Sequence, residues 1–481
     1  MKVTTLSDDI STTNGNHYLS DNQTLEDIER KDNFEILIAN NGITSCFVQL
    51  SKTVLSYRYR DKLKDKTKNV FVVDIIGCAV KEWEQSHKVL LNVIAYEVRR
   101  SQRVKREIKL LFCKHPIREQ NYEEAFDWKK SILSLNYGKI FNNNISVKSK
   151  PLLFIVNPKS GRGRALKIFE QTVKPLLKES ETDFETHITK HANHALEVMR
   201  DMEDITRFRA VVVVSGDGLL YEVVNGLTKR SDTLTDVKVP IALGIIPGGS
   251  GNGLAHAVNQ AFLNRVKSVD PIFDCTLHVI QGRPIPMDLV RVTTPANTYY
   301  AFLSVGWGLM ADIDIESERL RMIGEPRFTL WALYRSFALR KNRAVLSYLP
   351  AESTPSAAPP LDSPVPSDWV TIDDTFVQIY SAFQTHISST AIFAPNATFD
   401  DGLIWLVFIR GDVSRKQVIQ FLLALEKGKH PALPFVQMVP VRAFRIVPNG
   451  NVGKVTVDGE LIESGPVQAE VVPRMASVLS R

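Results

Sequence analysis

The sequence predicts an α/β domain followed by an antiparallel β-sandwich, with a small β-rich module in front of both. Three observations support this fold class. Residues 151–262 alternate short apolar runs with amphipathic stretches of helical spacing, which is typical of a parallel sheet covered by helices. Strand-like runs dominate again from about residue 286 to the end. Between residues 34 and 115, polar turns separate further short strand-like runs.

The composition is that of a globular protein. The chain has 481 residues, of which 23% are charged and 44% are hydrophobic. Its formal net charge of +6 suits contact with anionic membranes or phosphorylated ligands, but a nucleic-acid-binding protein concentrates far more basic charge. The four cysteines form no CxxC pair, and no apolar run is long enough to span a membrane. We therefore expect a cytoplasmic protein with peripheral membrane contact.

The first part of the chain divides into a tail and a module. Residues 1–33 are rich in Asp, Ser, Thr and Asn, which predicts a disordered N-terminus. Residues 34–145 place strand-like runs before an amphipathic helix, the element order of pleckstrin-homology-like modules, and we expect a β-rich regulatory module here. Its basic run at 99–109 is interpreted as a solvated hairpin, with contact to anionic lipids as the alternative.

The α/β domain is expected over residues 150–285. Its strands read LLFIVNP, FETHITK, AVVVVSG and IALGIIPGG, and a helix-like segment follows each of them. Such βαβ units build a parallel sheet in which the carboxyl ends of the strands and the N-termini of the helices share one edge. Ligands of open α/β sheets collect at this edge.

Three glycine-rich loops lie at that edge: Asn157–Gly163, Ser215–Gly218 and Pro247–Gly253. Glycine allows backbone N–H groups to approach phosphate oxygens without a Cβ in the way. A tight turn explains any one of the loops, but three on successive strands favour a phosphate-binding edge. Neither a Walker motif nor a proper GxGxxG is present, so the fingerprints of P-loop and dinucleotide-binding proteins are missing.

A single carboxylate, Asp217, follows the strand AVVVVSG between Gly216 and Gly218. At a phosphate-binding edge a carboxylate is electrostatically unfavourable unless it has a chemical role. It can hold Mg²⁺, or accept the proton of a hydroxyl that attacks a γ-phosphate. The alternative is that Asp217 caps the helix that follows. The two interpretations are compatible.

Residues 286–481 are expected to form the β-sandwich, with a flexible Pro/Ser-rich insertion at 350–369. The alternating stretch DIDIE predicts that Asp312, Asp314 and Glu316 face the same way on a strand. The apolar segment 328–342 ends in positive charge and is interpreted as a core helix. A membrane-binding or calmodulin-type target helix is the alternative.

Five separated motifs resemble the catalytic domain shared by diacylglycerol, ceramide and sphingosine kinases. They are NPKSGRG, SGDGLLYEVVNGL, GIIPGGSGNGLA, the segment 303–330 and the segment 457–473. The last two are similar to segments of the sphingosine (long-chain base) kinases. The resemblance covers about residues 150–345 and 370–480, and it implies an ATP-binding α/β domain and a lipid-binding sandwich.

The resemblance also implies roles for individual residues, with ATP and Mg²⁺ as cofactors and no direct metal ligand identified. Asp217 matches the general base. The residues that match nucleotide-binding positions are Asn157, Pro158, Lys159, Thr189, Lys190, His191, Ala192, Asn193, Gly218, Glu222, Gly249, Ser250, Gly251, Arg321, Arg327, Asp458, Gly459 and Glu460. Those that match substrate-binding positions are Ser215, Gly216, Asp217, Gly218, Ser304 and Asp314.

The expected function is therefore transfer of the γ-phosphoryl group of ATP to the primary hydroxyl of a sphingoid base. Asp314 would face the ammonium of that substrate, although spacing alone does not separate it from Asp312. A ceramide or diacylglycerol kinase is the nearest alternative. A non-catalytic, nucleotide-sensing membrane scaffold is an alternative of another class, and a nucleic-acid partner is not expected.

Overall fold

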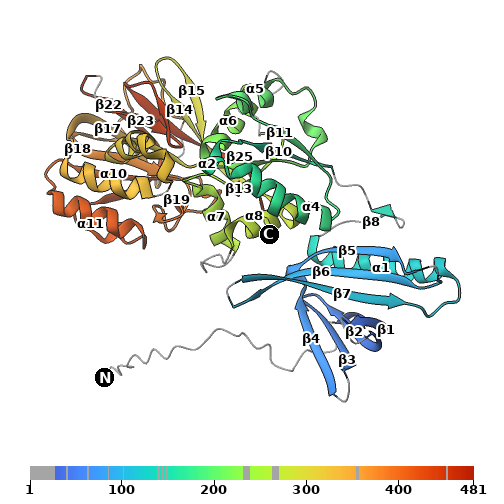
Figure 1. Cartoon of the computed structure of the whole chain (residues 1–481). Coiled ribbons are helices and arrows are strands. Elements are labelled where there is room, and N and C mark those ends of the chain that lie inside the picture. The colour runs from blue at the N-terminus through green and yellow to red at the C-terminus, as the bar shows by residue number, and fades with distance from the viewer. Residues whose placement is uncertain are drawn as a thin grey trace, which may run out of the picture.

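The computed structural model describes residues 28–481 except 39–41, 62–63, 85, 101, 138–140, 143–144, 147–149, 231–238, 263–269, 325, 354–356 and 451–452. Figure 1 shows three parts that follow one another along the chain: a blue N-terminal module, a green α/β part and a yellow-to-red β-rich part. Over the described ranges, no helix combines the length and the apolar character that crossing a membrane requires.

The N-terminal module is an antiparallel sheet closed by one helix, as expected of a β-rich region. Its strands are β1 (Ile28–Ile38), β2 (Gly42–Ser51), β3 (Val54–Asp61), β4 (Lys64–Phe71), β5 (Ile75–Glu82), β6 (Val89–Arg99) and β7 (Gln102–Phe112). They are ordered β4-β3-β2-β1-β7-β6-β5, and α1 (Arg118–Tyr137) buries Trp128 against Phe34. Residues 1–27 of the expected disordered tail lie outside the described residues, and β1 already covers 28–33.

The basic run 99–109 lies in the hairpin of β6 and β7, as expected, and most of its described residues are exposed, but several of its cations are paired. It forms most of β7, which lies with β6 in the half of the sheet beside the α/β part (Figure 1). Arg103 is nearly buried and donates hydrogen bonds to Asp74 at 2.9 Å and to Asp274 of the α/β part at 2.6 Å. Lys105 pairs with Glu179 at 2.8 Å. These two cations therefore already have carboxylate partners within the chain.

The α/β part contains the predicted parallel sheet, ordered β11-β10-β12-β13. Its strands are β10 (Leu152–Val156), β11 (Phe184–Ile188), β12 (Ala210–Ser215) and β13 (Ala242–Pro247), and all but β11 are buried along their full length. The helices that follow them include α2 (Ser160–Gly163), α4 (Lys174–Glu179), α5 (His194–Asp201), α6 (Asp217–Thr228) and α7 (Gly253–Phe262). A further helix, α8 (Pro271–Gln281), was not predicted.

The C-terminal part is an antiparallel arrangement of long and short strands. They are β14 (Arg283–Thr293), β15 (Thr298–Ala301), β16 (Ser304–Gly308), β17 (Asn342–Pro350), β18 (Val370–Ala382), β21 (Ile404–Arg410), β22 (Gln437–Pro448), β23 (Val455–Val457), β24 (Glu460–Ile462) and β25 (Val467–Ser480). The last strand joins the two parts, since β25 pairs with β14 and β22 and also meets β13 at Leu243 and Val478. The expected boundary at residue 285 therefore does not separate two independent sheets.

Two expectations for this part are wrong. The stretch DIDIE is not a strand but belongs to the helix α9 (Leu309–Glu316), so Asp312 and Glu316 share one helical face and Asp314 lies on another. The segment 328–342 provides α10 (Pro326–Phe337), which is not a core helix because its Leu330, Leu333, Tyr334 and Phe337 are exposed. Helical periodicity and alternation cannot be told apart over a stretch as short as five residues.

The Pro/Ser-rich insertion also differs from expectation. Its described residues pack on the sheet, where Ala358 and Val365 contact the cluster of Leu349, Trp369 and Ala443. The guanidinium of Arg445, which is 5% exposed, donates hydrogen bonds to the backbone carbonyls of Pro359, Pro360 and Ser363. These carbonyls are available because proline lacks the N–H group that would recruit the segment into a regular strand.

Candidate active site

One cavity of about 920 Å³ lies between the edge of the parallel sheet and the C-terminal part. Nearly all the residues singled out in the sequence line it. They are Asn157, Pro158, Lys159, Thr189, Lys190, His191, Ala192, Ser215, Gly216, Asp217, Gly218, Glu222, Gly249, Ser250, Gly251, Ser304, Asp314, Arg327, Asp458, Gly459 and Glu460. Asn193 does not line it, and the side chain of Arg321 lies outside the described part of the chain.

The three glycine-rich loops pack on one another, backbone to backbone. A Cβ on Gly161 would lie 2.1 Å from the carbonyl oxygen of Gly248, and one on Gly249 would lie 2.4 Å from the Cα of Gly216. Gly161 also has a φ of +56°. The glycines therefore allow the loops to approach each other, in addition to leaving room for a phosphate. Ser160 joins the outer two loops by donating a hydrogen bond of 3.2 Å to the Gly248 carbonyl.

Asp217 begins α6 but does not cap it. Its carboxylate accepts hydrogen bonds from the backbone N–H groups of Gly253 at 2.7 Å and Leu254 at 3.3 Å, the first two residues of α7. The side chain is only 7% exposed, and burial raises its pKa to about 6 although these N–H groups favour the ionised form. A carboxylate with this pKa is ionised near neutral pH and is a competent proton acceptor.

The nucleotide edge is built from the ends of β10 and β11. Asn157 accepts a hydrogen bond from the Lys159 N–H, and Thr189 donates its N–H to Val156. Glu222 of α6 accepts a hydrogen bond of 3.1 Å from the N–H of Ala195, at the start of α5. Burial raises the pKa of Glu222, and the N–H groups of the α5 N-terminus oppose that effect.

Asp458 and Gly459 form the two-residue turn between β23 and β24, and both have a positive φ, as a tight hairpin requires. The Asp458 carboxylate accepts three backbone N–H groups, from Phe302, Leu303 and Ser304. Burial raises its pKa to about 7 against these donors, and the nearby Asp217 adds to the increase. The turn is thereby fixed at the cavity, with Glu460 beside Gly218.

The structure separates Asp314 from Asp312. Asp312 is buried, and its carboxylate pairs with Arg335 at 2.6 Å, so it does not line the cavity. Asp314 lines the cavity instead, and burial raises its pKa to about 7, while Arg327 lowers it. Because Asp312 and Glu316 are one helical turn apart, they share cations on the opposite side of α9.

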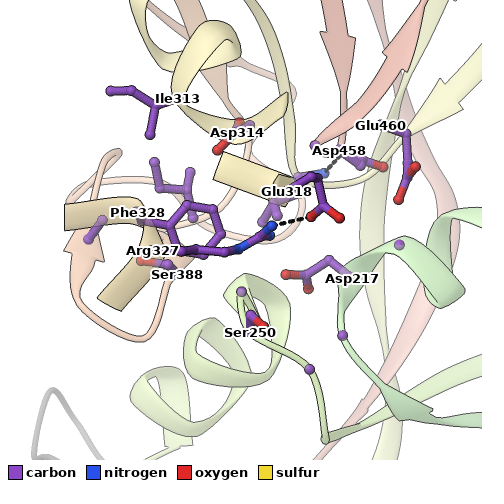
Figure 2. Close-up of a pocket in the computed structure, with 18 of the residues that line it drawn as sticks. Asp217, Ser250, Ile313, Asp314, Glu318, Arg327, Phe328, Ser388, Asp458 and Glu460 are labelled. Atoms are coloured by element: carbon purple, nitrogen blue, oxygen red, sulfur yellow. Dashed lines mark hydrogen bonds and ion pairs between the residues drawn. The ribbon is translucent and has the colours of Figure 1, made fainter. Parts of the chain in front are cut away.

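Arg327 lies at the start of α10 and is 7% exposed. Its guanidinium pairs with Glu318 and lies over the ring of Phe328 at 4.4 Å. Figure 2 shows this pair facing Asp217 across the cavity, with Asp314 on the helix above. Arg327 is therefore positioned near the proposed base, but it is already paired with a carboxylate.

Sequence reasoning missed the apolar arm of the cavity and a hairpin beside it. The arm is lined by Met310, Ile313, Phe328, Ala332, Leu333, Ile419, Leu422 and Leu425, mostly from α9, α10 and α11 (Arg415–Leu425). The hairpin of β19 (His386–Ser388) and β20 (Ala391–Ile392) contributes Ile387, Ser388, Thr390 and Ala391. The apolar periodicity of α10 was the one available signal, since HISSTAI matches no motif.

Comparison with known proteins identifies the two catalytic parts. Residues 151–292 match the family model of the diacylglycerol kinase catalytic domain, and residues 371–480 match that of the YegS C-terminal NAD kinase beta sandwich-like domain. Sphingosine kinase 1 of Mus musculus is 38% identical over 342 residues, which are 67% of this chain and 89% of the relative. The chain belongs to the sphingosine kinase family. It is therefore an ATP-dependent lipid kinase.

A second relative and a solved structure also match this sphingosine kinase chain. Sphingosine kinase 1 of Arabidopsis thaliana is 31% identical over 67% of the chain and 69% of its own length. The solved structure of a putative diacylglycerol kinase from Bacillus anthracis superposes with a TM-score of 0.52 at 18% identity, over 71% of this chain and 99% of that one, and shows the shared fold. Both family models begin after the N-terminal module, which they leave without a counterpart.

Proposed function

We propose that the chain transfers the γ-phosphoryl group of Mg-ATP to the primary hydroxyl of sphingosine or a related long-chain base, giving sphingosine 1-phosphate. The observation that carries the proposal is one cavity in which Asp217 lies between glycine-rich loops and an apolar arm. The loops suit the phosphates of a nucleotide, and the arm suits an aliphatic chain. A lipid hydroxyl placed between them reaches both the base and the γ-phosphorus.

In this reaction the hydroxyl oxygen forms a bond to the γ-phosphorus while the bond from that phosphorus to the β–γ bridging oxygen breaks, and ADP leaves. Asp217 accepts the hydroxyl proton. The Arg327 guanidinium leaves Glu318 and binds two oxygens of the transferred phosphoryl group. There it stabilises the negative charge that develops on that group. By the family resemblance, Arg321 supplies a second cation.

Asp314 is proposed to select the charged head group. A carboxylate and an ammonium about 4 Å apart attract each other by about 4 kcal/mol at an effective dielectric constant of about 20. Ceramide and diacylglycerol lack an ammonium, so they gain nothing from this carboxylate. The pairing of Asp312 with Arg335 leaves Asp314 as the acid of the DIDIE stretch that faces the cavity.

Mg²⁺ is proposed as the second cofactor. Among the described residues, no group of three His, Cys, Asp or Glu side chains is arranged to hold a metal ion. Mg²⁺ usually keeps waters and binds through one or two carboxylates together with substrate phosphates, so a single acid at the cavity is enough. Glu460, whose carboxylate lies beside Gly218, is the residue that would hold the ion, which would neutralise charge on the phosphates.

Peripheral membrane contact is proposed at the mouth of the apolar arm. Leu330, Leu333, Tyr334 and Phe337 of α10 and Leu423 of α11 are each more than half exposed. Leu333 and Leu423 also line the cavity, so a surface that enters a bilayer here connects directly to the lipid arm. Replacement of Leu333 and Tyr334 by Ser should reduce sedimentation with anionic vesicles, while Val370→Ser, another exposed apolar residue, should not.

Two finer expectations remain proposals. The sheet order and the closing helix of the N-terminal module support a pleckstrin-homology-like fold with a regulatory role. A calmodulin-type regulator at 328–342 stays a prediction, and Arg335, one of the cations such a partner would bind, is buried against Asp312.

The test is an assay of the purified full chain with labelled ATP and, in parallel, sphingosine, ceramide and diacylglycerol. Phosphorylation of sphingosine at a kcat/KM at least about tenfold above the other two is expected. Equal use of ceramide would assign the other substrate class. Nucleotide binding without phosphorylation of any of the three lipids would favour a non-catalytic scaffold.

A further inference from the structure

The hairpin of β19 and β20, from the C-terminal part, lies against the third glycine-rich loop. The N–H of Ser389 donates a hydrogen bond of 3.2 Å to the carbonyl of Gly251, and Ser388 forms an isolated β-bridge with Asn252. No motif in the sequence marks this contact, which joins residues 138 positions apart (251 and 389) and 136 positions apart (252 and 388).

The contact continues into the first turn of α7. A Cβ on Gly253 would lie 2.9 Å from the carbonyl oxygen of His386 and 3.0 Å from the carbonyl carbon of Ile387, so the hairpin backbone touches this residue directly. The rings of His256 and His386 lie 6.1 Å apart. Burial, and to a smaller extent the neighbouring His256, lower the pKa of His386 to about 4, so the His386 ring is neutral at pH 7.

The same turn of α7 holds Asp217. The N–H of Gly253 and the N–H of Leu254 are the donors to its carboxylate. The hairpin, for its part, lines the cavity with Ile387, Ser388, Thr390 and Ala391. Figure 2 shows Ser388 on the side of the cavity that carries Arg327 and Phe328, opposite Asp217. A lipid bound in the cavity would therefore contact the hairpin, and the hairpin packs on Gly253, one of the two donors to Asp217.

We propose that the β19–β20 hairpin is a positioning element, which holds the N-terminus of α7 so that its two N–H groups orient Asp217, and that lipid in the cavity tightens this hold. The inference rests on the proposed role of Asp217 as the base. It makes Ser389 a positioning residue that acts through its backbone N–H and touches neither substrate.

Ser389→Pro tests the proposal, with Ser389→Ala as the matched control. Ser389 and Thr390 are the two central residues of the turn, and neither has a positive φ, so proline is compatible with the first of these positions. Proline removes the N–H that reaches Gly251, whereas alanine keeps it and removes only the hydroxyl. The hairpin itself should remain folded in both variants.

We expect Ser389→Pro to lower kcat by about fivefold or more, with the KM for ATP unchanged, and to move the acidic limb of the pH profile of kcat upward by about half a unit or more. The reason is that the N–H groups of Gly253 and Leu254 lower the pKa of Asp217. When they are held less firmly, that pKa rises. The other ionisable groups around Asp217 are Asp458, Glu460, Tyr380 and, across the cavity, the paired Arg327 and Glu318, and neither variant changes them. Ser389→Ala should match the wild type.

Amide hydrogen exchange supplies a readout that does not depend on turnover. In the wild type, sphingosine should slow the exchange of the Gly253 and Leu254 amides, and in Ser389→Pro it should do so less. The inference would be overturned if Ser389→Pro kept the wild-type acidic limb of the kcat profile and the wild-type slowing of amide exchange. An equal loss of activity in Ser389→Pro and Ser389→Ala would also overturn it. Failure of the wild type to phosphorylate sphingosine would instead contradict the proposed function.

Discussion

The carboxylate of Asp217, the first residue of α6, accepts a hydrogen bond of 2.7 Å from the backbone N–H of Gly253, the first residue of α7. An acid that begins a helix commonly caps that helix, but this one binds the N-terminus of the next. This hydrogen bond holds Asp217 at the glycine-rich edge of the sheet, where its carboxylate lines the cavity.

Asp217→Asn should lower kcat by at least about 10²-fold and leave ATP binding nearly unchanged, because the amide cannot accept the proton. Steady-state kinetics and nucleotide titration on the full chain measure the two effects. Asp270→Asn is the matched control, since Asp270 caps α8 through the Phe273 N–H and does not line the cavity. Near-normal turnover of the Asp217→Asn protein would assign Asp217 a purely structural role.

The pH dependence of kcat/KM for sphingosine should show two groups that must be ionised. Burial raises the pKa of Asp217 to about 6 and that of Asp314 to about 7, so activity should fall below pH 7 and fall more steeply below pH 6. In Asp314→Asn only the limb near pH 6 should remain. A limb unchanged by this substitution would exclude Asp314 from head-group binding.

Asp314→Asn should lower kcat/KM for sphingosine by about tenfold or more at pH 8, a loss of about 1.4 kcal/mol, and leave the KM for ATP unchanged. Asp312→Asn is the neighbouring control. It leaves the buried Arg335 with one partner fewer, so it should lower the melting temperature more than it changes substrate choice. The opposite pattern would place the head group against Asp312.

The ligand-free protein should be stabilised by Asp314→Asn at pH 8 and much less so at pH 4. The folded state raises the pKa of this acid from 3.8 to about 7, so it binds a proton more tightly than the unfolded chain does, and stability falls as pH rises through that window. Above pH 7 the buried charge destabilises the wild type, and its removal should gain at least about 1 kcal/mol. Thermal unfolding across pH measures this, and a gain that does not vary with pH would contradict it.

Arg445→Ala should lower the free energy of unfolding by about 1–3 kcal/mol and leave kcat unchanged. It removes the donor shared by three carbonyls of the Pro/Ser-rich insertion, and buried acceptors without partners carry that cost. Arg343→Ala, at an exposed pair with Asp373, is the control for losing a surface arginine. Equal, small effects of the two substitutions would mean that the insertion contributes little stability.

Local pattern was sufficient for the α/β part and for the glycine-rich loops. Three of the four strands of its sheet are short apolar runs bounded by turns, and the parallel order brings the carboxyl ends of all four to one edge whatever follows in the chain. The family motifs located Asp217, Asp314 and Asp458, and the structure places all three at the same cavity. Each of these features can be predicted from one short stretch of sequence, without knowledge of the rest of the fold.

Features that depend on contacts between segments distant in the sequence became visible only in the tertiary structure. The periodicity of DIDIE did not fix its conformation. In the structure it is helical, Asp312 pairs with Arg335 of α10, and Asp314 is the one of its three acids that lines the cavity. The basic run 99–109 has acidic partners more than 70 positions away, such as Asp274 and Glu179. The hairpin against Gly251 and the apolar arm likewise arise only when the C-terminal part packs on the parallel sheet, because local propensity carries no information about which surfaces meet.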